Sequence, residues 1–491
     1  MRTSGILMPI FSLSSEYGIG TLGAEAFAFV DFLKKAGQSY WQLLPLNPTS
    51  FGDSPYQSFS SDAGNPYFID LDILADEALL NKEDYACVDF GTNPSAVDYE
   101  KLYNERYKVL RIAFSRFDRE NEDYIDFCNS ESDWLCDYAL FMAVKYSEGG
   151  VSRHEWTDGL RFRHMDAVEK AKTELAEEIE FYKFLQFKFY EQWFKLKEYA
   201  NRNGIKIIGD MPIYVADDSA DVWCHPEQFC LDNDFKPTVV AGCPPDAFSS
   251  EGQLWGNPVY DWDYMKNEAV PFSWWRARIK RALKIYDVVR IDHFRGFEKY
   301  YCIPAQNTDA KCGRWKKGPA MALFKEIRKD LGRDIPIIAE DLGIITEGVR
   351  KLLKSTGFPG MKVLQFAFSG DDSAYLPHNH IKNCVLYTGT HDNDTILGWA
   401  ENDGKNDAIY AKKYLNVKEN ESLGWAMMRS ALSSVADTVI LTMPDLLSLG
   451  SEGRINTPST ASGNWQWRMT KGCANDWLAG IIRELTETYK R

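Results

Sequence analysis

The stretch VVRIDHFRGF, residues 288–297, begins like a buried strand and then turns polar. Val288 and Val289 are typical of a core strand, yet Arg290 and Asp292 lie two residues apart and so project from one face of it. Because a buried charge is costly unless it is paired or hydrogen-bonded, the spacing predicts an ion pair. Such a pair is either purely structural or part of a reactive site.

Seven further runs along the chain share the apolar, β-rich character of this stretch, and helix-like segments follow most of them. Near-continuous apolar runs of this kind are typical of strands that are buried on both faces. Eight such strands separated by helical stretches predict an α/β fold, a (β/α)₈ barrel. The eight predicted strands lie within residues 5–10, 39–46, 205–215, 286–294, 335–343, 361–368, 384–392 and 437–447.

Residues 1–491 are therefore expected to form a single catalytic barrel with inserted, mainly helical subdomains. The long interval 70–204 predicts a helical insertion between the second and third strands, and 216–285 predicts a loop region over the active site. Helices are also expected at 24–37 and 319–332, where Gly37 and Gly332 supply stop signals. Within the insertion, four large apolar side chains recur at helical spacing and indicate packing. They are Leu185, Phe189, Trp193 and Leu196.

Composition narrows the possible partners and the compartment. With 71 acidic against 56 basic side chains the formal net charge is −15, which repels phosphate backbones and argues against a nucleic-acid partner. The ten cysteines are scattered without a C-x-x-C pair, as in reduced proteins. The opening MRTSGILMPIFSL is too short an apolar run for a signal peptide, and no stretch approaches 18 apolar residues. We expect a cytoplasmic protein without a membrane partner, either a monomer or a homodimer.

Four predicted strands end in acids: Asp210, Asp292, Glu340 and Asp392. The carboxyl ends of the strands of a (β/α)₈ barrel meet at one mouth, where the chemistry of such enzymes takes place. Converging carboxylates suit metal binding, or glycosidic bond cleavage by a nucleophile and a proton donor. Aromatic and amide groups in 51–68 and 252–262 favour a sugar substrate.

Several segments, in order along nearly the whole chain, resemble the hallmark segments of the 4-α-glucanotransferases, the glycoside hydrolase family 77 relatives of the α-amylases. They are FGDSPYQSFSSDAGNPYF (51–68), IIGDMPIYVADDSADVW (207–223), GCPPDAFSSEGQLWGNPVYDW (242–262), VVRIDHFRGF, IIAEDLG (337–343), LQFAF (364–368), YTGTHDNDT (387–395) and RINTPSTASGNWQWR (454–468). The resemblance implies a barrel without a C-terminal β-sandwich domain. It also implies transfer of an α-1,4-glucan segment to the 4-hydroxyl of glucose or a maltooligosaccharide, with no cofactor and no metal.

The resemblance assigns catalytic roles to three of the acids. Asp292 is the expected nucleophile, Glu340 the acid/base and Asp392 the third acid, which binds substrate hydroxyls and favours the transition state. Arg290, on the same strand face as Asp292, would favour its ionised form, whereas Glu340 must keep its proton near neutral pH. Asp341 follows Glu340, and on a strand the two would face opposite ways.

Further residues are expected to bind substrate. Tyr56 matches the aromatic platform for the sugar, Trp255 lies on a loop over the glucan, and His391 binds sugar hydroxyls. The remaining candidates are Asp210, Arg290, His293 and Asn464. Strand alternation directs His293 away from the face of Asp292, and Asn464 in GNW is compatible with a structural role instead.

Three other functions remain alternatives. An α-glucan hydrolase would use the same acids, since only the identity of the attacking hydroxyl differs. A metal-dependent isomerase or lyase would need a Lys or His base at a strand end, and the strand-end acids lack a matching Lys. A non-catalytic glucan-binding protein would bind without turnover, and Asp292, Glu340 and Asp392 argue against it.

Overall fold

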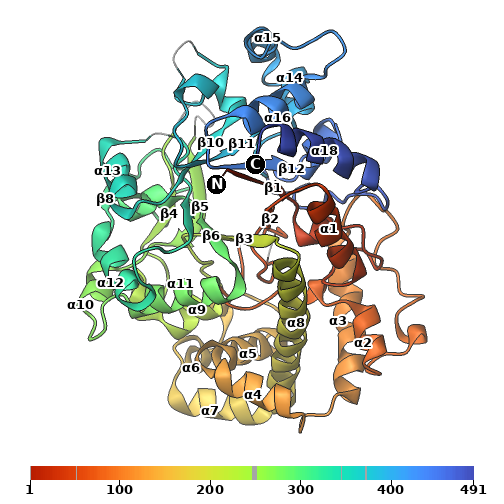
Figure 1. The fold of residues 1–491 in the computed structure, drawn as a ribbon. Helices are drawn as coiled ribbons and strands as arrows, with labels where there is room; N and C mark the ends of the chain where they lie inside the picture. The colour runs from red at the N-terminus through yellow and green to blue at the C-terminus, as the bar shows by residue number, and fades with distance from the viewer. Residues whose placement is uncertain (1, 51, 246–250, 344, 371–372) are drawn as a thin grey trace.

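Eight parallel strands form a closed barrel at the centre of the molecule (Figure 1). The computed structural model describes residues 2–50, 52–245, 251–343, 345–370 and 373–491. Around the barrel the strand order is β1-β12-β11-β10-β9-β6-β3-β2. The strands are β1 (Thr3–Leu7), β2 (Tyr40–Gln42), β3 (Lys206–Met211), β6 (Val288–Ile291), β9 (Ile337–Ala339), β10 (Gly360–Val363), β11 (Cys384–Tyr387) and β12 (Thr438–Thr442).

Each of these strands overlaps one of the eight runs predicted from the sequence, and the (β/α)₈ fold class is confirmed. The apolar side chains of the strands are buried on both sides, as in Ile207 and Ile208 of β3. Gly209 follows them because a side chain there would collide with the ring of Tyr286, 2.1 Å from the position of a Cβ. The register of β3 and β6 pairs Asp210 with Arg290, which sets two predicted site residues side by side.

Helices surround the barrel, and those at 24–37 and 319–332 are confirmed as α1 (Ala24–Lys35) and α12 (Met321–Leu331). The helices α9 (Ala220–Cys224), α10 (Trp262–Asn267) and α11 (Ser273–Ile285) lie between β3 and β6. Those after β9 are α13 (Glu347–Thr356), α14 (Ile396–Glu401), α15 (Lys405–Tyr414), α16 (Leu423–Ser433), α17 (Met443–Leu446) and α18 (Asp476–Thr488).

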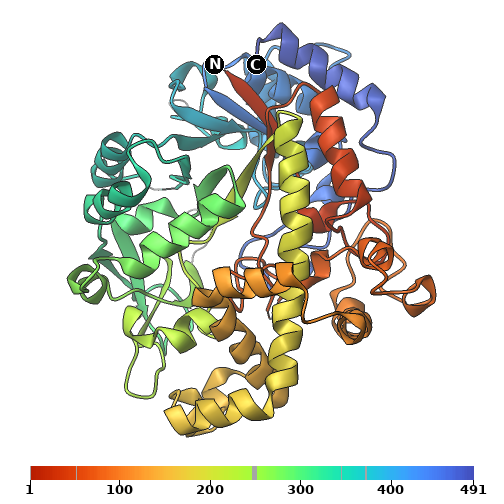
Figure 2. The same ribbon diagram turned by 60° about the horizontal axis from the view of Figure 1, so that its bottom comes forward.

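The chain between β2 and β3 forms a group of helices on one side of the barrel, and the longest, α8, reaches from this group to the barrel (Figure 2). The predicted packing stripe lies on α8, and all four of its side chains are buried. These helices are α2 (Leu71–Asp76), α3 (Tyr99–Arg116), α4 (Glu122–Ser130), α5 (Ser132–Ser147), α6 (Asp158–Arg161), α7 (Met165–Glu174) and α8 (Ala176–Arg202).

A second sheet, which the sequence did not predict, has four antiparallel strands in the order β5-β4-β7-β8. Its strands lack the long apolar runs of the barrel, and every residue of β8 is exposed. They are β4 (Val239–Cys243), β5 (Gln253–Pro258), β7 (Lys299–Pro304) and β8 (Arg314–Lys317).

The two ends of the chain meet on the barrel (Figure 1). The guanidinium of Arg491 donates to the carbonyl of Thr3 on β1 and to that of Ala436 before β12. Residues 443–491, all of them described, contain no strand. Among the described helices none is both long and apolar enough for a membrane span.

Candidate active site

Arg290 on β6 is the centre of a buried charge network at the carboxyl ends of the strands. Its Nη1 donates to both oxygens of Asp210 at 2.6 Å, and its Nη2 donates to Oδ1 of Asp292 at 2.9 Å. The side chains of Arg290 and Asp210 are 4% and 0% exposed, whereas Asp292 is 31% exposed. The ion pair that the 290/292 spacing predicts is therefore present. Asp210 neutralises much of the buried guanidinium, and Asp292 keeps a face that is open to a ligand.

Glu340 lies directly after β9, the neighbour of β6 in the barrel. Its two oxygens accept hydrogen bonds from the backbone N–H groups of His293 at 2.7 Å and Leu342 at 2.6 Å. Burial, and next the negative charge of Asp292, raise the pKa of the Glu340 carboxyl to about 8, against the opposing effect of Arg290. Glu340 therefore carries a proton at neutral pH.

Asp341 points elsewhere. Its Oδ1 accepts from the N–H of Met361 on β10 at 2.6 Å, and Gly360 leaves room for this carboxyl. Since β9 ends at Ala339, strand alternation does not determine the directions of the Glu340 and Asp341 side chains. The two side chains nevertheless point in different directions, as predicted.

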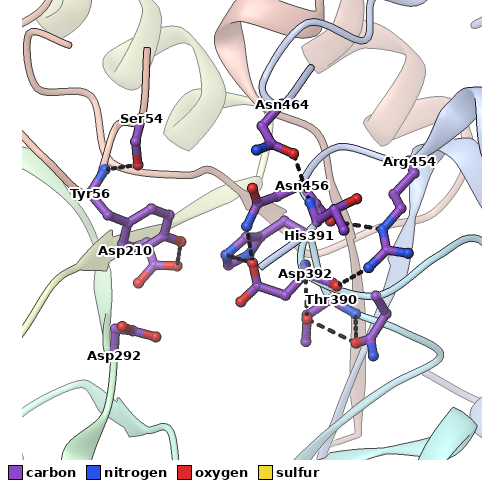
Figure 3. Close-up of polar contacts among 12 residues, drawn as sticks. Ser54, Tyr56, Asp210, Asp292, Thr390, His391, Asp392, Arg454, Asn456 and Asn464 are labelled. Atoms are coloured by element: carbon purple, nitrogen blue, oxygen red, sulfur yellow. Dashed lines mark hydrogen bonds and ion pairs between the residues drawn. The ribbon is translucent and has the colours of Figure 1, made fainter. Parts of the chain in front are cut away.

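Asp392 lies on the opposite side of the site from Asp210 and Asp292 (Figure 3). Its Oδ1 accepts from Nδ2 of Asn456 at 2.6 Å and lies 3.3 Å from Nε2 of His391. At 44% its side chain is the most exposed of the three predicted catalytic acids.

The Tyr56 hydroxyl donates to Oδ2 of Asp210 at 2.9 Å, and its ring stacks on His391 with centroids 5.2 Å apart and planes at 18°. The negative charges of Asp210, Asp292 and Asp392 all act on the pKa of this hydroxyl, which is raised mainly by burial. The charge of Glu340 likewise acts on the pKa of Arg290. The predicted acids therefore share one site, with an aromatic ring among them.

His293 and Trp255 meet edge to face, with ring centroids 4.8 Å apart and planes at 86°. β6 ends at Ile291 and His293 has a left-handed backbone, φ 48°, so the alternation used to orient its side chain does not apply. Burial lowers the pKa of His293 to about 4 and keeps the ring neutral. Its Nε2 is buried and accepts or donates no hydrogen bond among the described residues.

Asn464, another predicted binding residue, contacts its own loop. Its Oδ1 accepts from the N–H of Thr457 at 2.8 Å and its Nδ2 donates to the carbonyl of Thr460 at 3.1 Å. Asp392 instead receives hydrogen bonds from Asn456 and Arg454. Neither residue was singled out from the sequence. The quoted RINTPST segment contained both, but no spacing rule links them to position 392.

No three His, Cys, Asp or Glu side chains of the described ranges are grouped so as to hold a metal ion. The arrangement provides a carboxyl paired with an arginine, a buried carboxyl with a raised pKa at the end of the neighbouring strand, and hydrogen-bonding groups opposite. That set suits acid-assisted displacement at an acetal carbon.

Known proteins resemble this chain over its whole length. A family model described as 4-alpha-glucanotransferase matches residues 8–474. The 4-alpha-glucanotransferase of Clostridium butyricum is 52% identical over 488 residues, covering 99% of this chain and 100% of the relative, and that of Streptococcus pneumoniae is 48% identical, covering 100% and 97%. The structure of the amylomaltase from Streptococcus agalactiae in complex with acarbose has a TM-score of 0.97 at 45% identity and covers 100% of both chains.

Proposed function

Because the chain belongs to the 4-α-glucanotransferase family, glycoside hydrolase family 77, we propose that Asp292, Glu340 and Asp392 carry out glucan transfer by double displacement. Membership confirms the resemblance seen in the sequence, and the enzyme acts on α-1,4-glucans. The roles of individual residues are inferred from their environments.

In the first step Asp292 attacks the anomeric carbon of the donor glucan. Glu340 gives its proton to the glycosidic oxygen, so that the bond between this oxygen and the anomeric carbon breaks and the leaving chain departs with a free 4-hydroxyl. The retained segment is then an ester of Asp292. Burial of Glu340 supports its role as the acid, since its pKa is raised to about 8.

In the second step the 4-hydroxyl of an acceptor attacks the same carbon. Glu340, now ionised, takes the hydroxyl proton, and Asp292 leaves as a carboxylate. Two inversions retain the α configuration, and both acids return to their starting states. The ion pair with Arg290 at 2.9 Å supports Asp292 as a good leaving group, because it stabilises the ionised carboxylate.

The remaining side chains would hold the sugar. Asp392 accepts hydrogen bonds from sugar hydroxyls, and His391 also hydrogen-bonds to them. Tyr56, stacked on His391, presents an aromatic face to the sugar. Asp210 and Arg290, which form a buried 2.6 Å ion pair, support these side chains from the barrel interior.

Residues 216–285 would cover bound glucan and limit access of water, which favours transfer over hydrolysis. Two contacts support this: Gln57 donates to the carbonyl of Trp255 at 3.3 Å and to Oδ1 of Asn257 at 2.9 Å. Residues 246–250 of this segment lie outside the described part of the chain.

We further propose that 70–204 forms a helical insertion, that glucose or a maltooligosaccharide is the acceptor, and that the enzyme is cytoplasmic.

The observation that carries the mechanism is the contrast between two neighbouring carboxyls: Glu340 is buried with a raised pKa, and Asp292 is paired with Arg290. The test is to incubate the purified protein with maltotriose and separate the products. Glucose with a ladder of longer maltodextrins is expected. Glucose and maltose without longer products would mean hydrolysis, and unchanged maltotriose would leave the non-catalytic glucan-binding alternative.

A further inference from the structure

We propose that the segment 454–457 is a clamp that fixes the carboxylate of Asp392, and that Asn456 is its positioning residue. This inference deepens the proposed function, on which it rests. Asn456 is expected to act through Asp392 and not by touching the reacting atoms.

Hydrogen bonds join the clamp to both the backbone and the side chain of its target. The N–H of Asn456 donates to the carbonyl of His391 at 3.0 Å, and its Nδ2 donates to Oδ1 of Asp392 at 2.6 Å. Nη2 of Arg454 donates to the carbonyl of Asp392 at 3.1 Å (Figure 3). The 391–392 peptide and the carboxylate are thus held by one short segment.

The clamp is itself held in place. Nε of Arg454 donates to the carbonyl of Asn456 at 2.9 Å, which closes the segment on itself. The carbonyl of Ile455 accepts from the N–H of Trp465 at 2.7 Å, and Asn464 accepts from Thr457. Preorganised in this way, the amide donor is in place before substrate binds.

Asp392 needs such a partner because the rest of its surroundings restrain it weakly. Its side chain is 44% exposed, and the nearest ionisable group, Nε2 of His391, lies 3.3 Å away. The charged and titratable groups around it include Arg454, bonded to its carbonyl, the Tyr56 hydroxyl and, across the site, Asp292. A carboxylate without its 2.6 Å amide contact would rotate among several positions, and an acid placed about 1 Å off is a poor partner for a transition state.

The first test removes the amide. Asn456→Ala is expected to lower kcat for maltotriose about 10- to 100-fold, as for the loss of a hydrogen bond to a charged group, with KM changed much less. The matched control is Asn402→Ala, an Asn whose exposed amide donates to Ser451 Oγ at 3.0 Å. We expect Asn402→Ala to keep the wild-type kcat, and circular dichroism and Tm to show that both variants are folded.

The second test keeps the size of the side chain and adds a charge. In Asn456→Asp two carboxylates would face each other where an amide donor now lies, so at neutral pH they would share a proton. The acid limb of the kcat profile is expected to move to higher pH by about one pH unit or more. A residue that merely shaped the loop would not move this limb, and Asn402→Asp should leave it in place.

Asp392→Asn distinguishes failure of the clamp from failure of the proposed function. Normal turnover in Asp392→Asn would refute the proposed role of Asp392 itself. If Asp392→Asn is inactive while Asn456→Ala and Asn456→Asp retain the wild-type kcat and pH profile, the clamp is refuted and the proposed function stands.

Discussion

At the scale of single residues, two carboxyls at the ends of adjacent strands have contrasting surroundings: Asp292 is paired with Arg290, and Glu340 is buried with a raised pKa. Arg290 lies between Asp210 and Asp292 and donates to both. Glu340 is buried beside this network and receives two backbone N–H groups, yet burial and the charge of Asp292 dominate its titration. The buried ion pair of Arg290 with Asp210 therefore keeps a guanidinium beside Asp292, the proposed nucleophile.

The roles of the two acids predict different responses to amide substitution. Glu340→Gln is expected to slow transfer from maltotriose about 10²- to 10⁴-fold, the usual contribution of general acid catalysis. Asp292→Asn should lose about 10⁴-fold or more. α-Maltosyl fluoride, which needs no proton to leave, together with azide, which needs no base, should restore turnover to Glu340→Gln alone and give an α-glycosyl azide.

Failure of azide and the fluoride to rescue Glu340→Gln, or rescue of Asp292→Asn to the same rate, would contradict these assignments. A β-glycosyl azide from Glu340→Gln would contradict retention.

The raised pKa of Glu340 predicts an alkaline limit to activity. The first step needs the protonated carboxyl, so kcat for maltotriose should fall as the pH rises through about 8. With α-maltosyl fluoride as donor that step no longer needs the acid, and the fall should disappear or move to higher pH. A maltotriose profile that remains flat to pH 10 would show that Glu340 is not the acid.

The same shift predicts a loss of stability with pH. The Glu340 carboxyl has an ordinary pKa of 4.5 and a folded-state pKa of about 8, so between these values the folded protein binds more protons than the unfolded chain. The stability contributed by this group is complete below pH 4.5 and declines until about pH 8. The difference in Tm between Glu340→Gln and the wild type should therefore shift in favour of the variant between pH 5 and pH 8. Glu401→Gln, an exposed change on α14, should show no such trend.

At the scale of elements, the sequence predicts strands that are marked by long apolar runs. It misses features that depend on contacts between distant parts of the chain. All eight barrel strands were found because strands buried on both faces leave long apolar runs. The sheet β5-β4-β7-β8 was missed because its edge strand β8, residues 314–317, is exposed throughout and β5 contains Gly256 and Pro258. The orientation of His293 could not be derived, since the strand rule ends with β6 at Ile291.

The same division separates the site residues. Asp210 lies near the end of β3, and Asp292, Glu340 and Asp392 follow strands; all four were predicted from position and resemblance. Asn456 reaches Asp392 across 64 residues of sequence from an irregular segment, and no periodicity links the two.

The helices between β2 and β3 are tied to the loop after β3 by buried charges. Nζ of Lys145 on α5, 8% exposed, contacts Oδ2 of Asp218 at 2.6 Å, and Asp218 also accepts from the N–H of Arg153. Asp218→Asn would leave the ammonium without its counterion, at a cost of about 2–4 kcal/mol, below that of a fully buried pair because Asp218 is 30% exposed. Its Tm should fall by several degrees.

Asp158→Asn is the control for this change. Asp158 pairs with Arg161 but is 77% exposed, so the loss should stay below about 0.5 kcal/mol. Equal Tm values for Asp218→Asn and Asp158→Asn would show that the buried contact contributes nothing.

At the scale of the whole molecule, a net charge of −15 surrounds a site whose substrate is neutral. Such a field neither attracts nor repels maltodextrins, so kcat/KM for maltotriose should change less than about twofold between 20 and 500 mM NaCl. A sulfated maltodextrin is the matched probe, since the acidic molecule repels it at low salt. Its inhibition of transfer should therefore strengthen as salt is added, over the same range in which maltotriose turnover stays constant. A salt dependence of maltotriose turnover as steep as that of the sulfated probe would show that charge, and not neutral hydroxyl recognition, controls access to the site.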